Sequence, residues 1–283
     1  MTRPDRWAEW LAERRFGGSS VDVRREFMRH LTRTRDRVLD LAELQKGETL
    51  LDVGCGDGLI AFGALERGAH VVFSDVSKDL LDECRRIAGE IGVIERCEFV
   101  RAAADDLSAV GSESVDVVTT RSVLIYVQDK RRAFEEFVRV IRPGGRISLF
   151  EPINRLNRFG RAWDAAPVQE LEDRVKGVFE RLQPRDSDPM LNFDDRDLVS
   201  LAEEVGFAKI ELTLEVEVKP PDPLPWDAFL DMAWNPNVPS MREVLSEVLT
   251  AEERERYEEH MRPLIETGRG SRKMASAYLS ARR

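Results

Sequence analysis

The chain has 283 residues, enough for one large α/β domain or for a domain with an inserted cap. Its 53 acidic and 43 basic residues give a formal net charge of −10, which argues against a nucleic-acid partner because phosphate contacts need a basic field. The three cysteines lack the CxxC spacing of a zinc or redox site, and no apolar stretch reaches the length of a membrane span. We therefore expect a cytoplasmic protein with reduced thiols, no metal and no membrane as partner.

The first half of the chain changes from a helical pattern to an alternating one. Residues 1–45 predict an N-terminal helical cap, with an amphipathic helix over Val21–Leu44. Residues 46–152 alternate short apolar runs with helical patterns, which predicts βαβ units and a parallel sheet with helices on both faces. The predicted strands are Thr49–Val53, His70–Asp75, Glu98–Ala102, Val115–Thr120 and Arg146–Glu151, and the predicted helices between them are Leu59–Glu66, Ser77–Ile91 and Lys130–Ile141.

The second half interrupts this alternation twice. Residues 153–193 predict a helical insertion, residues 194–219 a continuation of the core, residues 220–270 a helical cap insertion, and residues 271–283 a final core strand. Strands over Ala208–Val218 and Met274–Ala281 should form an antiparallel pair at the edge. The predicted fold is a doubly wound α/β structure around a seven-stranded, mostly parallel sheet, with insertions after the fifth strand and between the sixth and seventh.

A glycine-rich turn follows directly on the first predicted strand. Gly54, Gly56 and Gly58 precede a helix, so they lie at the carboxyl edge of the sheet, where open α/β sheets bind ligands. Glycine suits such a turn because the backbone needs angles closed to other residues and the ligand approaches the main chain closely. Asp75 ends the next strand, where an acidic side chain can accept both hydroxyls of a ribose. A ligand that contains a nucleoside is indicated.

Two cofactors fit this pair of features. The string Gly56–Ala61 satisfies the G-x-G-x-x-A fingerprint of a dinucleotide site, which leaves an NAD(P)-dependent oxidoreductase open. However, Asp52 and Asp57 would repel a pyrophosphate without a metal or an arginine to compensate. S-adenosylmethionine carries no phosphate and has an ammonium and a sulfonium, which acidic neighbours favour.

Four motifs together resemble the class I S-adenosylmethionine-dependent methyltransferases. They are Leu50-Leu51-Asp52-Val53-Gly54-Cys55-Gly56-Asp57-Gly58, Phe73-Ser74-Asp75-Val76-Ser77, Val115-Asp116-Val117-Val118-Thr119-Thr120-Arg121-Ser122-Val123-Leu124 and Arg139-Val140-Ile141-Arg142-Pro143-Gly144-Gly145. Their order and spacing match the family over about residues 45 to 152, whereas the two ends of the chain carry no family motif. The resemblance implies a Rossmann-like fold and methyl transfer from S-adenosyl-L-methionine, which leaves S-adenosyl-L-homocysteine.

The resemblance also implies how the cofactor is held. Asp52 and Gly54 would lie at its methionine end, Gly56 and Gly58 along the loop, Asp75 on the ribose and Val76 against the adenine. Arg121, which ends a strand, is expected to pair with a loop carboxylate or with the cofactor's own carboxylate. The full predicted set of cofactor residues is Asp52, Gly54, Cys55, Gly56, Gly58, Asp75, Val76, Ala104, Asp105, Arg121 and Ser122.

The chain departs from the family after the third strand. Ala103 stands where the family often has an aspartate that binds the adenine amino group. Asp105, two positions later and beside the Ala104 backbone, is the expected replacement. The alternative is that Asp105 and Asp106 cap a helix.

The acceptor side of the site is predicted from the ends of the fourth and fifth strands. Tyr126 would orient a nucleophile, and Glu151 would act as a base or hold a cationic substrate. Asn154, Trp163 and Trp234 complete the predicted substrate contacts. Aromatic residues at helical spacing are more often core, so this role stays open for the tryptophans.

The leading hypothesis is a methyltransferase that acts on an oxygen or nitrogen of a small molecule. Because positioning and exclusion of water can carry much of the rate of methyl transfer, an obligatory catalytic residue is not required. A non-catalytic module that binds the cofactor or a partner is the alternative, since Ala103 would fit a degraded site. The sequence defines neither the acceptor nor the oligomeric state.

Overall fold

The computed structural model describes residues 5–9, 21–157, 163–233 and 237–283. Seven strands in these ranges form one sheet in the order β3-β2-β1-β4-β5-β7-β6, and β7 is antiparallel to both of its neighbours. The prediction of a doubly wound, mostly parallel sheet is thereby confirmed, including the antiparallel pair at its edge. The strands are β1 (Thr49–Val53), β2 (His70–Asp75), β3 (Cys97–Arg101), β4 (Val115–Arg121), β5 (Ile141–Pro152), β6 (Ala208–Lys219) and β7 (Arg272–Arg282).

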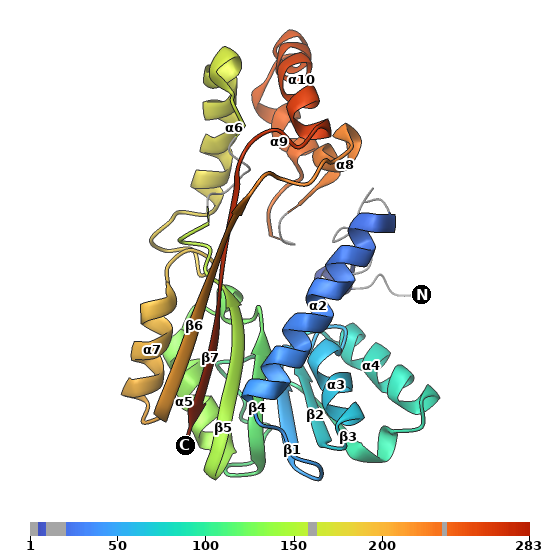
Figure 1. Ribbon diagram of the computed structural model, residues 1–283, viewed down its shortest axis with the longest axis vertical. Coiled ribbons are helices and arrows are strands. Elements are labelled where there is room, and N and C mark those ends of the chain that lie inside the picture. Colours follow the sequence, from blue (N-terminus) through green and yellow to red (C-terminus); the bar gives the residue numbers. More distant parts are fainter. Residues whose placement is uncertain (1–4, 10–20, 158–162, 234–236) are drawn as a thin grey trace.

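Helices cover both faces of this sheet (Figure 1). α2 (Val21–Leu41), α3 (Leu59–Glu66) and α4 (Lys78–Glu90) pack on one face, and α5 (Lys130–Val140) and α7 (Asp195–Glu204) on the other. Side chains of neighbouring residues in β1 pack on opposite faces of the sheet, with Leu50 in one apolar cluster and Leu51 in the other. Because both faces of the sheet are buried, the sequences of its strands are nearly continuous apolar runs.

The junction of α5 with β5 differs slightly from the prediction. α5 ends at Val140, and Ile141 already pairs with Val115 of β4. The ladder then shifts, because Val117 pairs with Arg146, so the four residues in between bulge out of the pairing. The glycine pair therefore forms a bulge within the strand, whereas the sequence predicts a loop before it.

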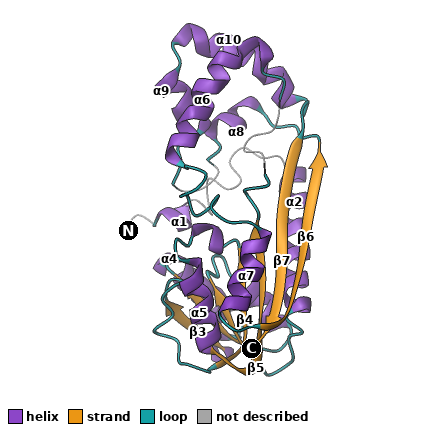
Figure 2. Cartoon of the chain, turned by 90° about the vertical axis from the view of Figure 1, so that its left-hand side faces the viewer, coloured by secondary structure: helices purple, strands orange, loops and turns teal. Residues whose placement is uncertain are grey.

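The two insertions form one helical cap. α6 (Gln169–Leu182) comes from the first insertion, and α8 (Trp226–Asp231), α9 (Met241–Val248) and α10 (Ala251–Glu266) come from the second. All four contribute to a single apolar cluster, and the Tyr257 hydroxyl of α10 donates to Glu172 of α6 at 2.7 Å. Figures 1 and 2 show this cap beyond the carboxyl edge of the parallel strands, reached by the long strands β6 and β7.

The N-terminal region contributes to the core. The second half of α2 buries Leu31, Val38 and Leu39, and the Ser148 hydroxyl of β5 donates to the Val38 carbonyl at 2.7 Å. The helix ends at Leu41, three residues before the predicted end. Short helices complete the described chain: α1 (Arg6–Glu9) and the 3-10 turns η2 (Ile94–Arg96), η3 (Leu124–Tyr126) and η4 (Ala166–Val168).

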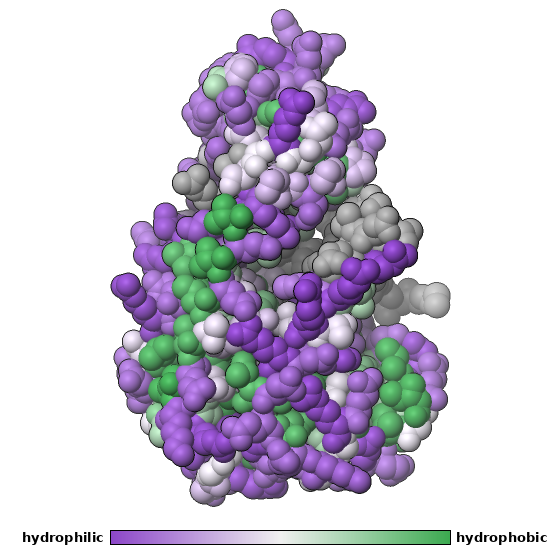
Figure 3. All heavy atoms as spheres, in the orientation of Figure 1, coloured by the Kyte–Doolittle hydropathy of each residue, from purple (hydrophilic) through white to green (hydrophobic). Residues whose placement is uncertain are grey.

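Hydrophilic residues cover most of the face seen in Figure 3, over both the cap and the lower part of the molecule. Among the described residues, no helix has the length and apolar character needed to cross a membrane.

Candidate cofactor and acceptor site

The glycine loop adopts the backbone that its sequence predicts. Gly54, Gly56 and Gly58 have φ values of 64°, 55° and 82°, in the left-handed region that favours glycine. At two of these positions, glycine is also needed because there is no room for a Cβ. A Cβ on Gly54 would stand 2.5 Å from Cγ2 of Val123, and one on Gly58 would stand 2.5 Å from the ring of Phe62. Larger residues at these two positions would have to displace their neighbours.

Asp75 lies beside this loop at the end of β2. One carboxylate oxygen accepts the Gly56 amide at 2.9 Å, and the other accepts the Ser77 amide at 2.8 Å. Burial raises the pKa of Asp75, against the lowering effect of these hydrogen bonds. The next residue, Val76, is an apolar side chain with 44% of its surface exposed. An anchored carboxylate and an exposed apolar side chain therefore adjoin the loop, as the sequence predicts.

Asp52 supports the loop from below. Its side chain is buried, and its two oxygens accept the Ala61 amide at 3.1 Å and the Thr119 hydroxyl at 3.0 Å. Burial raises the pKa of Asp52 to about 7, although the hydrogen bonds and the nearby Arg121 guanidinium act in the opposite direction. The carboxylate therefore joins the first turn of α3 to β4. The contact with the methionine end of a cofactor, implied by the family resemblance, stays a prediction.

Cys55 contributes its backbone to the loop and its thiol to the interior. The Cys55 amide donates to the Ser74 carbonyl at 2.9 Å, while its sulfur and that of Cys84 lie 3.9 and 3.5 Å from the Gly56 carbonyl oxygen. The hydrogen bond with Cys84, together with burial, raises the pKa of the Cys55 thiol well above its usual range. Both thiols are free and buried.

A tight turn follows β3 where the adenine is expected to bind. The Asp106 amide donates to the Ala103 carbonyl at 3.1 Å, and no helix begins here, so the alternative role of Asp105 and Asp106 as a helix cap is wrong. Asp106 instead accepts the Ser108 amide at 3.2 Å. Ala104 is buried and Asp105 is half-buried. The adenine contact of Asp105 stays a prediction.

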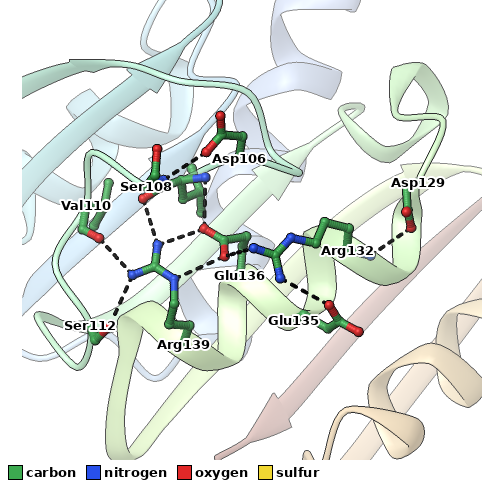
Figure 4. A network of polar contacts seen from close by, with 10 residues as sticks. Asp106, Ser108, Val110, Ser112, Asp129, Arg132, Glu135, Glu136 and Arg139 are labelled. Atoms are coloured by element: carbon green, nitrogen blue, oxygen red, sulfur yellow. Dashed lines mark hydrogen bonds and ion pairs between the residues drawn. The ribbon is translucent and has the colours of Figure 1, made fainter.

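Two residues of α5 that are not among the predicted site residues hold this turn in place. Glu136, which is buried, accepts the Leu107 amide at 2.9 Å and pairs with Arg139 at 2.7 Å (Figure 4). Arg139 also donates to the carbonyls of Leu107 and Val110, at 2.7 and 3.0 Å. The available signal was a glutamate and an arginine three residues apart on a helix, a spacing that places both on one face.

The end of β4 forms a strained turn next to the glycine loop. Ser122 has φ 60°, a conformation uncommon for a residue with a Cβ, and its amide donates to the Phe150 carbonyl at 2.8 Å. Arg121, just before it, is half-buried. The pKa of His30 on α2 is lowered, mainly by burial. The positive charge of Arg121 contributes to this lowering. The predicted pairing of Arg121 with a loop carboxylate is not among the ion pairs of the described residues.

Glu151 lies at the carboxyl end of β5, as predicted, but its side chain is buried. Its side chain is 0% exposed, and Oε1 accepts the Thr120 hydroxyl at 3.1 Å and the amides of Val123 and Leu124 at 2.9 and 3.1 Å. Oε2 accepts the Ile125 amide at 3.4 Å. Burial raises the pKa of Glu151 to about 7. This burial and these contacts disfavour the roles of base and substrate ligand, which stay predictions.

The short helix α1 packs near the start of α4 and against Tyr126. The Trp7 ring packs edge-on against Tyr126, with ring centroids 4.8 Å apart, and Asp5 accepts the hydroxyl of Ser77. The Asp5 amide also donates to Asp79 at 2.7 Å. Asp5 is not among the site residues predicted from the sequence, although an aspartate before a helix is a capping signal and it does accept the amides of the first turn.

The remaining predicted substrate residues lie in two places. Asn154 is half-buried in the turn after β5 and accepts the side-chain amide of Asn157 at 3.0 Å. Trp163 packs edge-on against Phe229, at 5.7 Å, next to Trp226 in the apolar cluster of the cap. This contact favours the core role that the sequence left open for Trp163. Trp234 lies outside the described residues.

Comparison with known proteins agrees with this geometry. Residues 51–149 match the family model described as a methyltransferase domain. The tRNA 5-carboxymethoxyuridine methyltransferase of Escherichia coli K12 is 35% identical over 114 residues, which are 40% of this chain and 43% of that protein. The ubiquinone biosynthesis O-methyltransferase of Aliivibrio fischeri MJ11 is 34% identical over 118 residues, 42% of this chain and 49% of that protein. The matched segment thus spans less than half the length of these relatives.

The solved structures extend the likeness of the fold beyond the matched segment. A geranyl diphosphate methyltransferase, solved in complex with S-adenosylmethionine, superposes with a TM-score of 0.53 at 18% identity, covering 98% of this chain and 96% of that one. Residues 51–149 therefore form a methyltransferase domain of the class I, S-adenosylmethionine-dependent kind. S-adenosylmethionine is the cofactor of this class.

Proposed function

We propose that the chain transfers a methyl group from S-adenosylmethionine to an oxygen or nitrogen of a small molecule and releases S-adenosyl-L-homocysteine. The observation that carries the proposal is the left-handed glycine loop at the carboxyl edge of the sheet, bonded to Asp75 through the Gly56 amide. The cap formed by the two insertions supports an enclosed acceptor site, because both β6 and β7 reach it from the same edge.

The residues of the site fit the cofactor. Each Asp75 oxygen accepts one backbone amide, and a carboxylate oxygen has a second lone pair, so both can still accept a ribose hydroxyl. An adenine against Val76 would cover an exposed apolar side chain. The missing Cβ of Gly54 leaves its backbone open to close approach. When bound, S-adenosylmethionine supplies a methyl group on a sulfonium for in-line displacement.

The other cofactor contacts belong to this proposal. Ala104 and Asp105 form the turn assigned to the adenine edge, and Arg121 and Ser122 the strand end assigned to the methionine. Arg121 is the cation of this set, and the methionine carboxylate of the cofactor is a matching anion. Tyr126, packed under Trp7 of α1, is the candidate wall of the acceptor site.

A small-molecule acceptor fits the chain better than a nucleic acid does. The formal net charge of −10 disfavours binding to a phosphate backbone, even though one relative is named as a tRNA methyltransferase. The Aliivibrio relative is named as an O-methyltransferase of ubiquinone biosynthesis, which favours oxygen as one of the two candidate acceptor atoms.

Calorimetry with S-adenosylmethionine and with NAD(P) tests the cofactor, and incubation of methyl-labelled cofactor with a metabolite panel, followed by mass spectrometry, tests the acceptor. We expect binding of S-adenosylmethionine and labelled product from at least one hydroxyl or amine compound. Binding without any transfer to the panel, to tRNA or to protein would favour the non-catalytic module. Binding of NAD(P) alone would overturn the proposal.

The Asp75→Ala variant tests the ribose contact directly. Loss of a charge-assisted hydrogen bond pair should weaken S-adenosylmethionine binding about tenfold or more. The control is Asp82→Asn, because Asp82 is an exposed carboxylate of the adjacent helix α4 whose partner is Lys78. Equal affinities of Asp75→Ala and wild type in calorimetry would contradict the contact.

A further inference from the structure

A short segment after β4 lies between Glu151 and the glycine loop. The Val123 amide donates to Glu151 at 2.9 Å. The side chain of Val123 packs over Gly54. A Cβ added to Gly54 would lie only 2.5 Å from Cγ2 of Val123. One hydrogen bond and one van der Waals contact therefore connect the end of β5 to the loop assigned to the cofactor.

The conformation of this segment depends on an acceptor at Glu151. The amides of Val123, Leu124 and Ile125 all point at the same carboxylate, and the residue before them, Ser122, is held in the left-handed region. Buried amides without an acceptor are costly, and a strained residue persists only where its surroundings fix it. Removal of the carboxylate would therefore release the segment.

The same contacts separate Glu151 from the reacting groups. A general base must come within hydrogen-bond reach of the proton that it removes. Glu151 is fully buried, and Oε1 is already shared by three donors from Thr120, Val123 and Leu124. Its effect on the site must therefore pass through the segment that it binds.

We propose that Glu151 is a positioning residue that fixes residues 122–125 over Gly54 and thereby sets the shape of the cofactor site. This inference rests on the proposed function, since it assigns S-adenosylmethionine to the glycine loop. Glu151 acts through Val123, and Ser122 provides the sharp turn that directs the three amides inward.

Truncation and conservative replacement give different expected results. In Glu151→Ala, S-adenosylmethionine should bind about tenfold more weakly, and the amides of residues 123–125 should exchange with solvent about tenfold faster or more. In Glu151→Gln, the amide oxygen can replace Oε1 as acceptor, so affinity should stay within about threefold of wild type. Calorimetry and amide hydrogen exchange measure the two effects.

A second variant keeps the carboxylate and removes the contact with the loop. Val123→Ala leaves the amide that Glu151 binds but takes away the side chain that packs over Gly54. We expect weaker binding of S-adenosylmethionine with unchanged exchange of the amides of residues 124 and 125. This variant also tests the proposal if Glu151→Ala does not fold, and wild-type affinity in Val123→Ala would overturn it.

Glu48→Ala is the matched control. Glu48 also accepts a backbone amide, that of Gln45, and pairs with the buried Arg146 at 2.6 Å, but it lies at the opposite edge of the sheet. Its truncation should lower the melting temperature and leave cofactor affinity unchanged.

Wild-type affinity in a folded Glu151→Ala, or an equal loss of affinity in Glu48→Ala, would overturn the positioning role alone. A wild-type chain that binds no S-adenosylmethionine would overturn the proposed function, and this inference with it.

Discussion

At the residue scale, the buried acids divide into two kinds according to their partners. Glu136 pairs with arginines, and its hydrogen bonds with Arg139 hold the pKa of its carboxyl below the usual range. Asp52 and Glu151 have only neutral donors in direct contact, so burial dominates and raises the pKa of each to about 7. Charge compensation thus separates Glu136, whose pKa is lowered, from Asp52 and Glu151, whose pKa values are raised.

The raised pKa of Asp52 predicts a pH dependence of stability. Because its pKa is higher in the folded than in the unfolded protein, the folded state binds more protons between about pH 4 and 7. The contribution of Asp52 to the free energy of unfolding therefore falls as the pH rises through this window, by at most about 1.4 kcal/mol per pH unit. Urea unfolding at pH 5 and 7.5 should show this slope reduced in Asp52→Asn relative to wild type.

The control for this slope is Asp82→Asn, an exposed acid on α4. It should keep the wild-type difference between the two pH values. An unchanged difference in Asp52→Asn would mean that burial does not perturb the Asp52 carboxyl.

The proposed pairing of Arg121 with the methionine carboxylate of S-adenosylmethionine can be tested directly. If Arg121 binds the methionine end of the cofactor, Arg121→Gln should weaken S-adenosylmethionine binding about tenfold. Decarboxylated S-adenosylmethionine, which lacks that group, should bind wild type and variant equally. Calorimetry with both ligands measures this, with Arg131→Gln as a control on the exposed face of α5, where Arg131 pairs with Glu204. Equal loss for both ligands would assign Arg121 a different role.

At the element scale, the turns of the site are held by side chains from other elements, two of them from an adjacent strand and one from helix α5. The glycine loop after β1 is bonded by Asp75 at the end of β2, and the turn after β4 is bonded by Glu151 near the end of β5. The turn after β3 is held by Glu136 of α5. Each of these turns therefore takes its shape from a side chain on a strand or a helix, which agrees with loops positioned by a rigid scaffold.

At the scale of the whole molecule, the cap depends on contacts between two insertions that are far apart in sequence. Tyr257 of α10 is 1% exposed and donates to Glu172 of α6 at 2.7 Å, and Arg174 of α6 pairs with Glu253 of α10 at 2.6 Å. The apolar cluster of the cap is separate from the two clusters of the core sheet. The cap therefore has its own packing, and its stability can be changed without changing the sheet.

This separation predicts the effect of Tyr257→Phe. Loss of a buried hydrogen bond to a carboxylate should lower the free energy of unfolding of the cap by about 1.5–3 kcal/mol. The amides of α6 and α10 should exchange faster, while S-adenosylmethionine affinity stays at the wild-type value. Ser246→Ala, an exposed hydroxyl on α9 that donates to Arg242, is the control and should change neither quantity. Faster exchange throughout the core strands would contradict an independently packed cap.

The sequence by itself determined the parts of the protein that are encoded locally. Apolar runs defined the strands, glycines defined the loop, and strand order placed Asp75 beside that loop, because each depends on neighbouring residues or on strand order. The tertiary structure decided where distant residues meet. It folded the turn at residues 123–125 around the Glu151 carboxylate, packed α1 against Tyr126, and joined two insertions into one cap. Such contacts depend on burial and on long-range packing, which no spacing along the chain encodes.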